Sequence, residues 1–489
     1  MLSLVFLLLI SIPAAVIAAP SCSYDAYYDY GFATGMENTV IYDAIMQMLN
    51  LSEKRDAFVA RARAHAEYLE KDHPEIYRRY YGLAQSLSTD VSEVVALSLF
   101  LPVILFRGCT TSASAPPATD DGVYLSWNLD LWPLWGLKQV ITFPPFSVVS
   151  IPGKNRYMVF GIPLVAGIGL LNDKGLALVG NACGTTDDGE GLTVLEISTL
   201  VMEECSNVEE AAGLIEGLDR FSSSGFSLFN MNYLLADAEG GICSIEATHN
   251  YFHAAFGGQN ESHLEWANKE LLEVEGREGV LSQGNHHQYL DFNKTGAPSP
   301  GPEGYESSWI RTNRMWDLLR ENYGDIDLEK AMSFTKDRAN GVSVGPFEQG
   351  GFNSICRTEF PLGYIDYYLG SLSGKYIAGG TSAWAHDMYV LGPDQTDWAF
   401  VIEPQERVIW WAAGWPTLFD YRPIHCGELL GEGAPVSSGL GPVDSLCNRW
   451  VRCYSGSLNG AIRILSGSTT ESLSSMMNSV LKRVANAME

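Results

Sequence analysis

The stretch Phe106-Arg107-Gly108-Cys109-Thr110-Thr111 joins an apolar run to a cysteine that directly follows a glycine. Glycine has no Cβ, so the Gly108–Cys109 peptide bond can be strained and open to attack by the cysteine thiol. Such an attack would cut the chain and leave Cys109 as a new N-terminus. The sequence therefore predicts self-cleavage between Gly108 and Cys109.

After cleavage, one residue would carry both a nucleophile and a base. An α-amino group has an ordinary pKa of about 8 and a thiol one of about 8.5, so the amine can accept the thiol proton near neutral pH. A thioester would then form and pass its acyl group to water or to an amine. This chemistry needs no cofactor, and the adjacent His286 and His287 lack the spacing of a metal site.

The pattern of the chain predicts an α+β fold. Residues 23–100 are rich in helix formers, and further helices are expected over 192–218 and Ser308–Asn322. Short β-rich runs separated by Gly, Pro, Asn or Asp predict the strands. These runs are Val103–Phe106, Val123–Trp127, Val148–Ile151, Tyr157–Phe160, Leu176–Val179, Asn232–Ala236, Ile242–Ala247, Met388–Leu391, Trp398–Glu403 and Val408–Ala412. Blocks of strands bounded by blocks of helices favour layered sheets over a repeating strand–helix–strand unit.

Polar residues end the strand that follows the cysteine, in the run Ser126-Trp127-Asn128-Leu129-Asp130. A β-hairpin would place Asp130 near Cys109, where its carboxylate can bind the new α-ammonium group. An ordinary turn aspartate is the alternative. Several aromatic residues nearby fit either an acyl pocket or the protein core; they are Trp127, Trp132, Trp135, Phe143 and Phe146.

Several motifs, taken in order, resemble those of the N-terminal-nucleophile hydrolases. The junction Gly-Cys-Thr-Thr is followed about twenty residues later by Trp-Asn-Leu-Asp, and later motifs extend the similarity over roughly residues 80–415. These motifs are Gly169–Leu176 with Asn181, Gly284-Asn285-His286-His287, Ser307-Ser308 with Arg311 and Arg314, Cys356-Arg357, and Thr381-Ser382. The chain is most similar to the acyl-coenzyme A:6-aminopenicillanic-acid acyltransferase family, and more distantly to acid ceramidase and the choloylglycine hydrolases.

This resemblance implies a four-layer αββα sandwich preceded by a helical prosegment. It also implies that the Asn285 side chain and the Asn181 backbone N–H bind the tetrahedral oxyanion. Arg357 would lie near the active site, where it binds a substrate carboxylate or holds Asp130, with a structural ion pair as the alternative. Asn128 and Arg311 are secondary candidates, and Arg311 shares one helix face with Arg314.

Composition excludes some partners. The 489 residues include 31 basic and 58 acidic ones, giving a net charge of −27. Such a chain repels nucleic acid and anionic membrane surfaces, so we expect neither as a partner. The expected partner is a small acyl-amide substrate.

The apolar N-terminal segment favours export. Residues 2–18 followed by Pro20 resemble a secretory signal peptide, although no Lys or Arg precedes them, and a membrane anchor is the alternative. We therefore expect a secreted or lysosomal protein without a membrane span after signal removal. The predicted organisation is a signal peptide (1–19), a helical propeptide that becomes the small chain (20–108), a catalytic domain (109–415) and a loop-rich C-terminal extension with a terminal helix (416–489). The two self-derived chains are expected to stay associated.

Export also permits disulfides and glycans. Nine cysteines would leave eight for pairing once Cys109 is set aside, with Cys447 and Cys453 the nearest pair. Glycosylation motifs occur at Asn50, Asn260 and Asn293.

Three functions compete on this evidence. The leading one is a self-processed thiol hydrolase that cleaves a linear amide of the N-acyl amine or N-acyl amino acid type. An acyltransferase that passes the acyl group to an amine is the second. The third is an uncleaved, disulfide-bonded scaffold or lipid-binding protein without catalysis. A papain-like protease fits poorly, because the flanks of Cys109 and the later histidines do not match its pattern.

Overall fold

The computed structural model describes most of the chain between residues 25 and 431. The described ranges are 25–52, 54–131, 146–222, 230–301, 306–340, 342–344, 347–349, 353–357, 395–412, 416–417 and 420–431. The predicted signal peptide, the aromatic residues Trp132, Trp135 and Phe143, the predicted strand Met388–Leu391, the pair Thr381-Ser382 and the predicted terminal helix lie outside these ranges.

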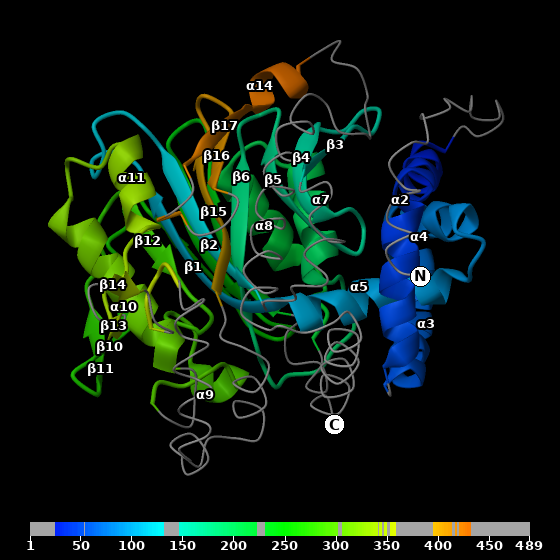
Figure 1. The fold of residues 1–489 in the computed structure, drawn as a ribbon, viewed down its shortest axis with the longest axis horizontal. Helices are drawn as coiled ribbons and strands as arrows, with labels where there is room; N and C mark the ends of the chain where they lie inside the picture. Colours follow the sequence, from blue (N-terminus) through cyan, green and yellow to red (C-terminus); the bar gives the residue numbers. More distant parts are fainter. Residues whose placement is uncertain are drawn as a thin grey trace, which may run out of the picture.

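Two antiparallel sheets face each other at the centre of the molecule (Figure 1). The first has six strands in the order β12-β1-β2-β15-β16-β17, and the second has seven in the order β3-β4-β5-β6-β7-β8-β9. The first sheet comprises β12 (Val280–Gln283), β1 (Phe106–Ser114), β2 (Tyr124–Leu131), β15 (Gln395–Glu403), β16 (Val408–Ala412) and β17 (Arg422–His425). The second comprises β3 (Phe146–Val149), β4 (Tyr157–Ile162), β5 (Ala166–Asn172), β6 (Ala177–Cys183), β7 (Asn230–Ala236), β8 (Ile242–Ala247) and β9 (Phe252–Phe256).

Helices cover the outer face of each sheet. The helices α10 (Glu306–Glu321) and α11 (Leu328–Phe334) pack on the six-stranded sheet, and α7 (Val194–Glu204) and α8 (Val208–Gly217) pack on the seven-stranded one. Because both faces are covered, every residue of β6, β7 and β8 is buried. The predicted αββα sandwich is confirmed.

Smaller elements complete the described fold. Two hairpins lie outside the main sheets, β10 (His263–Ala267) with β11 (Glu270–Val274) and β13 (Val342–Val344) with β14 (Phe347–Gln349). Two short helices are α9 (Phe292–Thr295) and α14 (Cys426–Leu429).

The prosegment is helical, as predicted, and packs beside the sandwich (Figure 1). It consists of α2 (Ala26–Leu51), α3 (Arg55–Asp72), α4 (Pro74–Ser86) and α5 (Val91–Leu105). Two buried side-chain contacts join it to α7. Arg79 of α4 donates two hydrogen bonds of 2.8 and 2.6 Å to Glu203, and His65 Nε2 of α3 lies 3.1 Å from both carboxylate oxygens of Glu196.

Two sequence-based boundaries differ from the structure. The strand predicted over Val103–Phe106 is wrong, because α5 continues to Leu105 and β1 begins at Phe106. The β-branched residues of this run prefer strands only weakly, and their position at the end of a helix overrides that preference. The six-stranded sheet also includes Arg422–His425, beyond the predicted end of the catalytic domain at residue 415.

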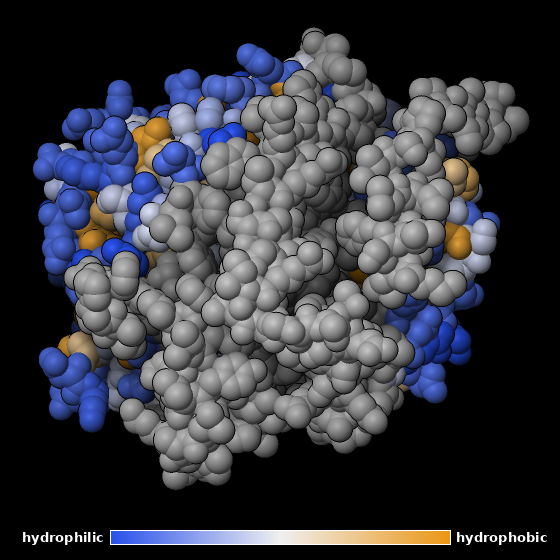
Figure 2. Space-filling model, viewed as in Figure 1, coloured by the Kyte–Doolittle hydropathy of each residue, from blue (hydrophilic) through white to orange (hydrophobic). Residues whose placement is uncertain are grey.

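The face of the molecule seen in Figure 2 is largely hydrophilic where its residues are described, with small separate hydrophobic patches. This surface agrees with the excess of 58 acidic over 31 basic residues. Among the described residues, no helix is long and apolar enough to cross a membrane.

Candidate active site

Cys109 lies in a paired strand, four residues after α5 ends at Leu105. Its side chain is buried, with 1 % of the residue exposed. The backbone N–H of Cys109 donates to Asn285 Oδ1 over 3.0 Å, and its carbonyl oxygen accepts from Arg311 Nη1 over 2.7 Å. Side chains from distant parts of the sequence therefore hold both backbone groups of the predicted nucleophile.

The Cys109 thiol faces the second sheet. Two residues further along β1, Thr111 Oγ1 accepts a 2.8 Å hydrogen bond from Asn181 Nδ2 of β6 in that sheet. Side chains two residues apart on a strand share a face, so Cys109 also points between the sheets. Thr110 points the other way, because its hydroxyl accepts from Arg311 on α10.

Burial dominates the ionisation of this thiol in the intact chain. It raises the pKa of Cys109 to about 12, and the negative charge of Asp130 adds to the rise. The side chains of Trp127 and Arg311 act in the opposite direction and lower this pKa. The uncut protein therefore holds Cys109 as a neutral thiol at physiological pH.

Of the two predicted asparagines, Asn285 contacts Cys109 itself, whereas Asn181 bonds Thr111, two residues further along β1. Besides accepting from Cys109, Asn285 donates through Nδ2 to the carbonyl oxygen of Ala182 over 2.8 Å. Its backbone N–H donates to Ser308 Oγ over 2.7 Å. The side-chain amide expected to bind an oxyanion is thus bonded to Ala182 in the intact chain.

Asp130 lies opposite Gly108 across β1 and β2, as the predicted hairpin requires. In the intact chain, its carboxylate contacts arginines and a threonine on the outer side of the sheet. Arg357 Nε lies 3.3 Å and Arg311 Nη1 lies 3.7 Å from Asp130 Oδ2, and Thr396 Oγ1 donates to Oδ1 over 2.8 Å. All of these side chains are fully buried.

Arg357 lies beside Asp130 in the intact chain, a contact that fits both the predicted role of holding Asp130 and the structural ion pair given as its alternative. Its Nη2 also donates to Ser307 Oγ over 3.0 Å, and Arg311 Nε donates to the same hydroxyl over 3.4 Å. Asn128 has a different role: its Nδ2 donates to the carbonyl oxygens of Thr335 and Ile355 over 2.9 and 3.1 Å. Asn128 therefore anchors neighbouring loops rather than the cysteine backbone.

No sequence pattern indicated Thr396, and Arg311 was only a secondary candidate although its side chain contacts the Cys109 carbonyl oxygen. Thr396 lies opposite Asp130 where β15 pairs with β2, a register that the sequence does not reveal. Arg311 contacts Cys109 O, Thr110 and Asn285 Oδ1, the last over 3.0 Å from Nη2. Arg314, on the same helix, instead bonds Asp337 over 2.9 Å.

The two adjacent histidines are buried and neutral. His286 Nδ1 lies 2.7 Å from Ser308 Oγ, and its ring stacks on Trp309 at 3.7 Å between centroids. His287 Nδ1 lies 2.8 Å from Thr295 Oγ1. Burial lowers the pKa of both rings, that of His287 to about 3. The described residues contain no group of three His, Cys, Asp or Glu side chains arranged to hold a metal ion.

The predicted disulfides are absent among the described cysteines. Six cysteines are free and buried, namely Cys109, Cys183, Cys205, Cys243, Cys356 and Cys426. Cys22 and the pair Cys447 and Cys453 lie outside the described residues. The three glycosylation motifs are on the surface, with Asn50, Asn260 and Asn293 all exposed.

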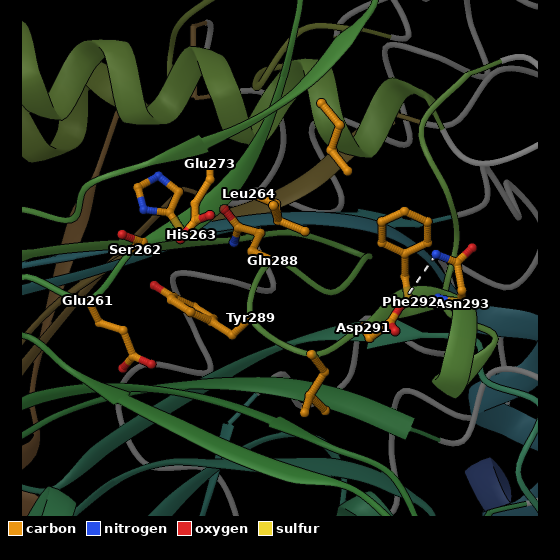
Figure 3. A pocket seen from close by; sticks show the side chains of 12 residues that line it. Glu261, Ser262, His263, Leu264, Glu273, Gln288, Tyr289, Asp291, Phe292 and Asn293 are labelled. Atoms are coloured by element: carbon orange, nitrogen blue, oxygen red, sulfur yellow. Dashed lines mark hydrogen bonds between the residues drawn. The ribbon is translucent and has the colours of Figure 1, made fainter.

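A cavity of about 370 Å³ lies between the β10–β11 hairpin and the segment Tyr289–Asn293 (Figure 3). Its lining includes Glu261, Glu273 and Asp291 together with His263 and Phe292. None of the residues that contact Cys109 lines this cavity.

Comparison with known proteins adds a family match. Residues 154–354 match the model of the acyl-coenzyme A:6-aminopenicillanic acid acyl-transferase family. This match covers less than half of the chain and agrees with the family that the sequence motifs resemble. The matched residues begin after Cys109, so the role of this cysteine stays a prediction.

Solved structures with some similarity include two variants of one hydrolase. A mutant of the conjugated bile acid hydrolase of Clostridium perfringens is 13 % identical, with 64 % of this chain and 92 % of that chain covered and a TM-score of 0.27. A second variant of the same hydrolase is also 13 % identical, with 68 % and 99 % covered and a TM-score of 0.27. Penicillin V acylase of Agrobacterium tumefaciens is 11 % identical, with 62 % and 82 % covered and a TM-score of 0.30. No curated protein matches the sequence.

Proposed function

We propose that this protein is an N-terminal-nucleophile hydrolase, which cuts itself between Gly108 and Cys109 and then hydrolyses a linear amide through a Cys109 thioester. The observation that carries the proposal is the fixation of the Cys109 backbone. Asn285 Oδ1 accepts from its N–H over 3.0 Å, and Arg311 donates to its carbonyl oxygen over 2.7 Å. The peptide group to be cut is thereby held next to the thiol that attacks it.

Self-cleavage balances without any further reagent except water. Cys109 Sγ attacks the Gly108 carbonyl carbon, the C–N bond to Cys109 breaks, and the thiol proton passes to the departing amine. The resulting Gly108 thioester is then hydrolysed to a Gly108 carboxylate and a free thiol. Asn285 Oδ1, which accepts from the amide N–H before cleavage, is positioned to accept from the α-amine afterwards.

Catalysis on a substrate follows the same chemistry. The α-amine takes the thiol proton, the sulfur attacks the substrate carbonyl, and the amine protonates the leaving nitrogen. Water then hydrolyses the acyl–sulfur bond, which releases a carboxylate and restores the thiol. Asn181 N–H and Asn285 Nδ2 are the proposed oxyanion donors. Asn285 Nδ2 carries two N–H donors; one bonds the Ala182 carbonyl oxygen over 2.8 Å, which leaves the second for the oxyanion.

The proposed substrates are N-acyl amines or N-acyl amino acids, and the proposed compartment is extracellular or lysosomal. The apolar segment 2–18 and the three exposed glycosylation motifs support an exported protein. We propose that the small chain 20–108 stays bound after cleavage, because Arg79–Glu203 and His65–Glu196 are buried pairs across that interface.

Replacement of Cys109 by alanine tests this proposal. We expect the wild-type protein to run as two chains under reducing conditions, with Cys109 as the N-terminal residue of the larger one. Cys109→Ala should run as one chain and lack amidase activity, since it has neither the thiol nor the new amine. N-terminal sequencing and a gel measure both outcomes.

Three results would contradict the proposal. A single wild-type chain would support the non-catalytic scaffold, although the six free cysteines already argue against a disulfide-bonded one. Cleavage of Cys109→Ala at the same bond would assign the cut to another protease. Activity that requires an added amine acceptor would make the protein an acyltransferase.

A further inference from the structure

The indole of Trp127 is fully buried yet its Nε1–H has no hydrogen-bond partner among the described residues. Other described tryptophans behave differently. Trp309 donates to the Pro298 carbonyl over 3.2 Å, Trp316 donates to Gln288 Oε1 over 2.9 Å, and Trp410 donates to Glu403. A buried donor without an acceptor costs about 1–3 kcal/mol, so Trp127 is an exception that calls for a functional reason.

Strand register places this indole beside the Cys109 sulfur. Trp127 on β2 pairs with Thr111 on β1, and Cys109 pairs with Leu129, so Trp127 and Cys109 are diagonal neighbours across the two strands. Both side chains share the face that points between the sheets, and aromatic side chains reach such diagonal neighbours. Phe400, on the neighbouring strand β15, stacks on the indole at 5.5 Å between ring centroids and so fixes the position of the ring.

The acceptor strength of sulfur changes with its charge. A neutral thiol is a weak acceptor, whereas a thiolate is a strong one, because hydrogen bonds to ionised groups are about twice as strong as neutral ones. An indole N–H that finds no good partner while Cys109 is a thiol therefore gains one when the sulfur ionises.

We propose that the Trp127 indole N–H donates a hydrogen bond to the Cys109 thiolate in the cleaved enzyme and is a catalytic residue. This inference rests on the proposed function, since the thiolate arises when the thiol proton moves to the α-amine. The indole transfers no proton; it stabilises the charge on the sulfur before attack. In the intact chain, the indole N–H already lies near enough to the sulfur to lower the pKa of Cys109 against the effect of burial, although no hydrogen bond of normal geometry joins the two groups.

The test compares Trp127→Phe with wild type in the full-length, self-cleaved protein. Phenylalanine keeps an aromatic ring against Phe400 and removes only the N–H donor and part of the ring. Alkylation of Cys109 by iodoacetamide is followed against pH by mass spectrometry of the N-terminal peptide of the large chain. We expect the pH midpoint of Cys109 alkylation to be higher in Trp127→Phe than in wild type by about one pH unit or more. At pH values below that midpoint, substrate turnover by the variant should be about tenfold slower.

Trp411→Phe is the matched control. Trp411 is buried in the same aromatic cluster, 5.1 Å from Phe146 between ring centroids, and the strand register places it on β16, away from β1. Its replacement should leave the alkylation midpoint unchanged. An unchanged midpoint in Trp127→Phe would overturn the inference while leaving the proposed function intact, whereas an uncut wild-type protein would overturn both.

A measurement on wild type covers the case in which Trp127→Phe fails to fold or mature. In protein labelled with ¹⁵N at the indoles, one N–H resonance should titrate with the same midpoint as Cys109 alkylation. Its titration should disappear once Cys109 is alkylated. If no indole resonance follows the thiol, the proposed hydrogen bond does not form.

Discussion

Ser308 links the asparagine beside Cys109 to helix α10. Its hydroxyl oxygen accepts from the Asn285 backbone N–H over 2.7 Å and lies 2.7 Å from His286 Nδ1. Asn285 in turn accepts from Cys109. Ser308 does not contact the cysteine, so its expected effect on the reaction is through the position of Asn285.

We expect Ser308→Ala to slow self-cleavage and turnover by about tenfold, the effect of losing one buried hydrogen bond of about 1–1.5 kcal/mol. Ser308→Thr should recover much of the rate, because it retains the hydroxyl. The time course of cleavage on a gel and kcat on a test amide measure the effect. Equal losses in the alanine and threonine variants would show that packing, not the hydroxyl, matters.

Sequence identified most side chains around Cys109 but not their partners. Asn285 and Asn181 were predicted from the family resemblance, and both contact the β1 strand. Arg311 was a secondary candidate, yet it donates to the Cys109 carbonyl. Its reach depends on how α10 lies on the six-stranded sheet, and no local pattern in the helix specifies that packing.

Two prosegment helices cross at glycines, which brings their backbones together. A Cβ added at Gly82 of α4 would lie 2.2 Å from the Tyr28 carbonyl oxygen of α2, and one at Gly31 would lie 2.0 Å from that of Arg79. The approach is therefore reciprocal, and Arg79 at this crossing also forms the buried pair with Glu203.

Gly82→Ala should destabilise the protein by about 1–3 kcal/mol, because the backbones must separate to admit a methyl group. Gly213→Ala is the control: Gly213 lies in α8 with nothing within 4 Å of an added Cβ, so alanine there should stabilise by about 0.5–1 kcal/mol. Denaturant unfolding of the Cys109→Ala chain measures both. If Gly82→Ala left the free energy of unfolding unchanged, the two helices could move apart at the crossing with little loss of stability.

Helices and central strands were predictable where the pattern was long or strongly apolar. The prosegment helices, α7, α8 and α10 and strands such as β7 and β8 follow their sequence patterns. The hairpin of β10 and β11 was missed. Residues of β11 are mostly exposed, so no alternation of buried side chains marks it. The helix end before β1 was also misplaced, because the β-branched run was assigned to a strand whereas α5 continues to Leu105.

The whole protein should lose stability in acid because of the buried histidines His286 and His287. Burial lowers the pKa of His287 to about 3 and that of His286 well below its ordinary value of 6.5. Below pH 6.5 the unfolded chain binds these protons and the folded chain does not. Stability therefore falls as the pH decreases from about 6.5, by up to about 1.4 kcal/mol per pH unit for each histidine.

His287→Gln should reduce this pH dependence, since glutamine does not titrate and can still bond Thr295. We expect the variant to lose less unfolding free energy than the parent between about pH 7 and about pH 5, measured by denaturant titration at each pH. His253→Gln serves as a control at a partly exposed histidine. If the unfolding free energy fell equally with decreasing pH in the parent and in His287→Gln, His287 would have to bind its proton in the folded state as well.

The position of Cys109 inside a paired and buried strand has a kinetic consequence. A protease acting from outside must gain access to the peptide bond, but Cys109 is 1 % exposed, Gly108 and Cys109 pair with β2, and β12 pairs with β1 from Thr111 onward. Maturation by the chain itself is then a first-order process. Its half-time should be the same in dilute and concentrated solution, and mixing cut molecules with uncut Cys109→Ala molecules should leave the latter intact.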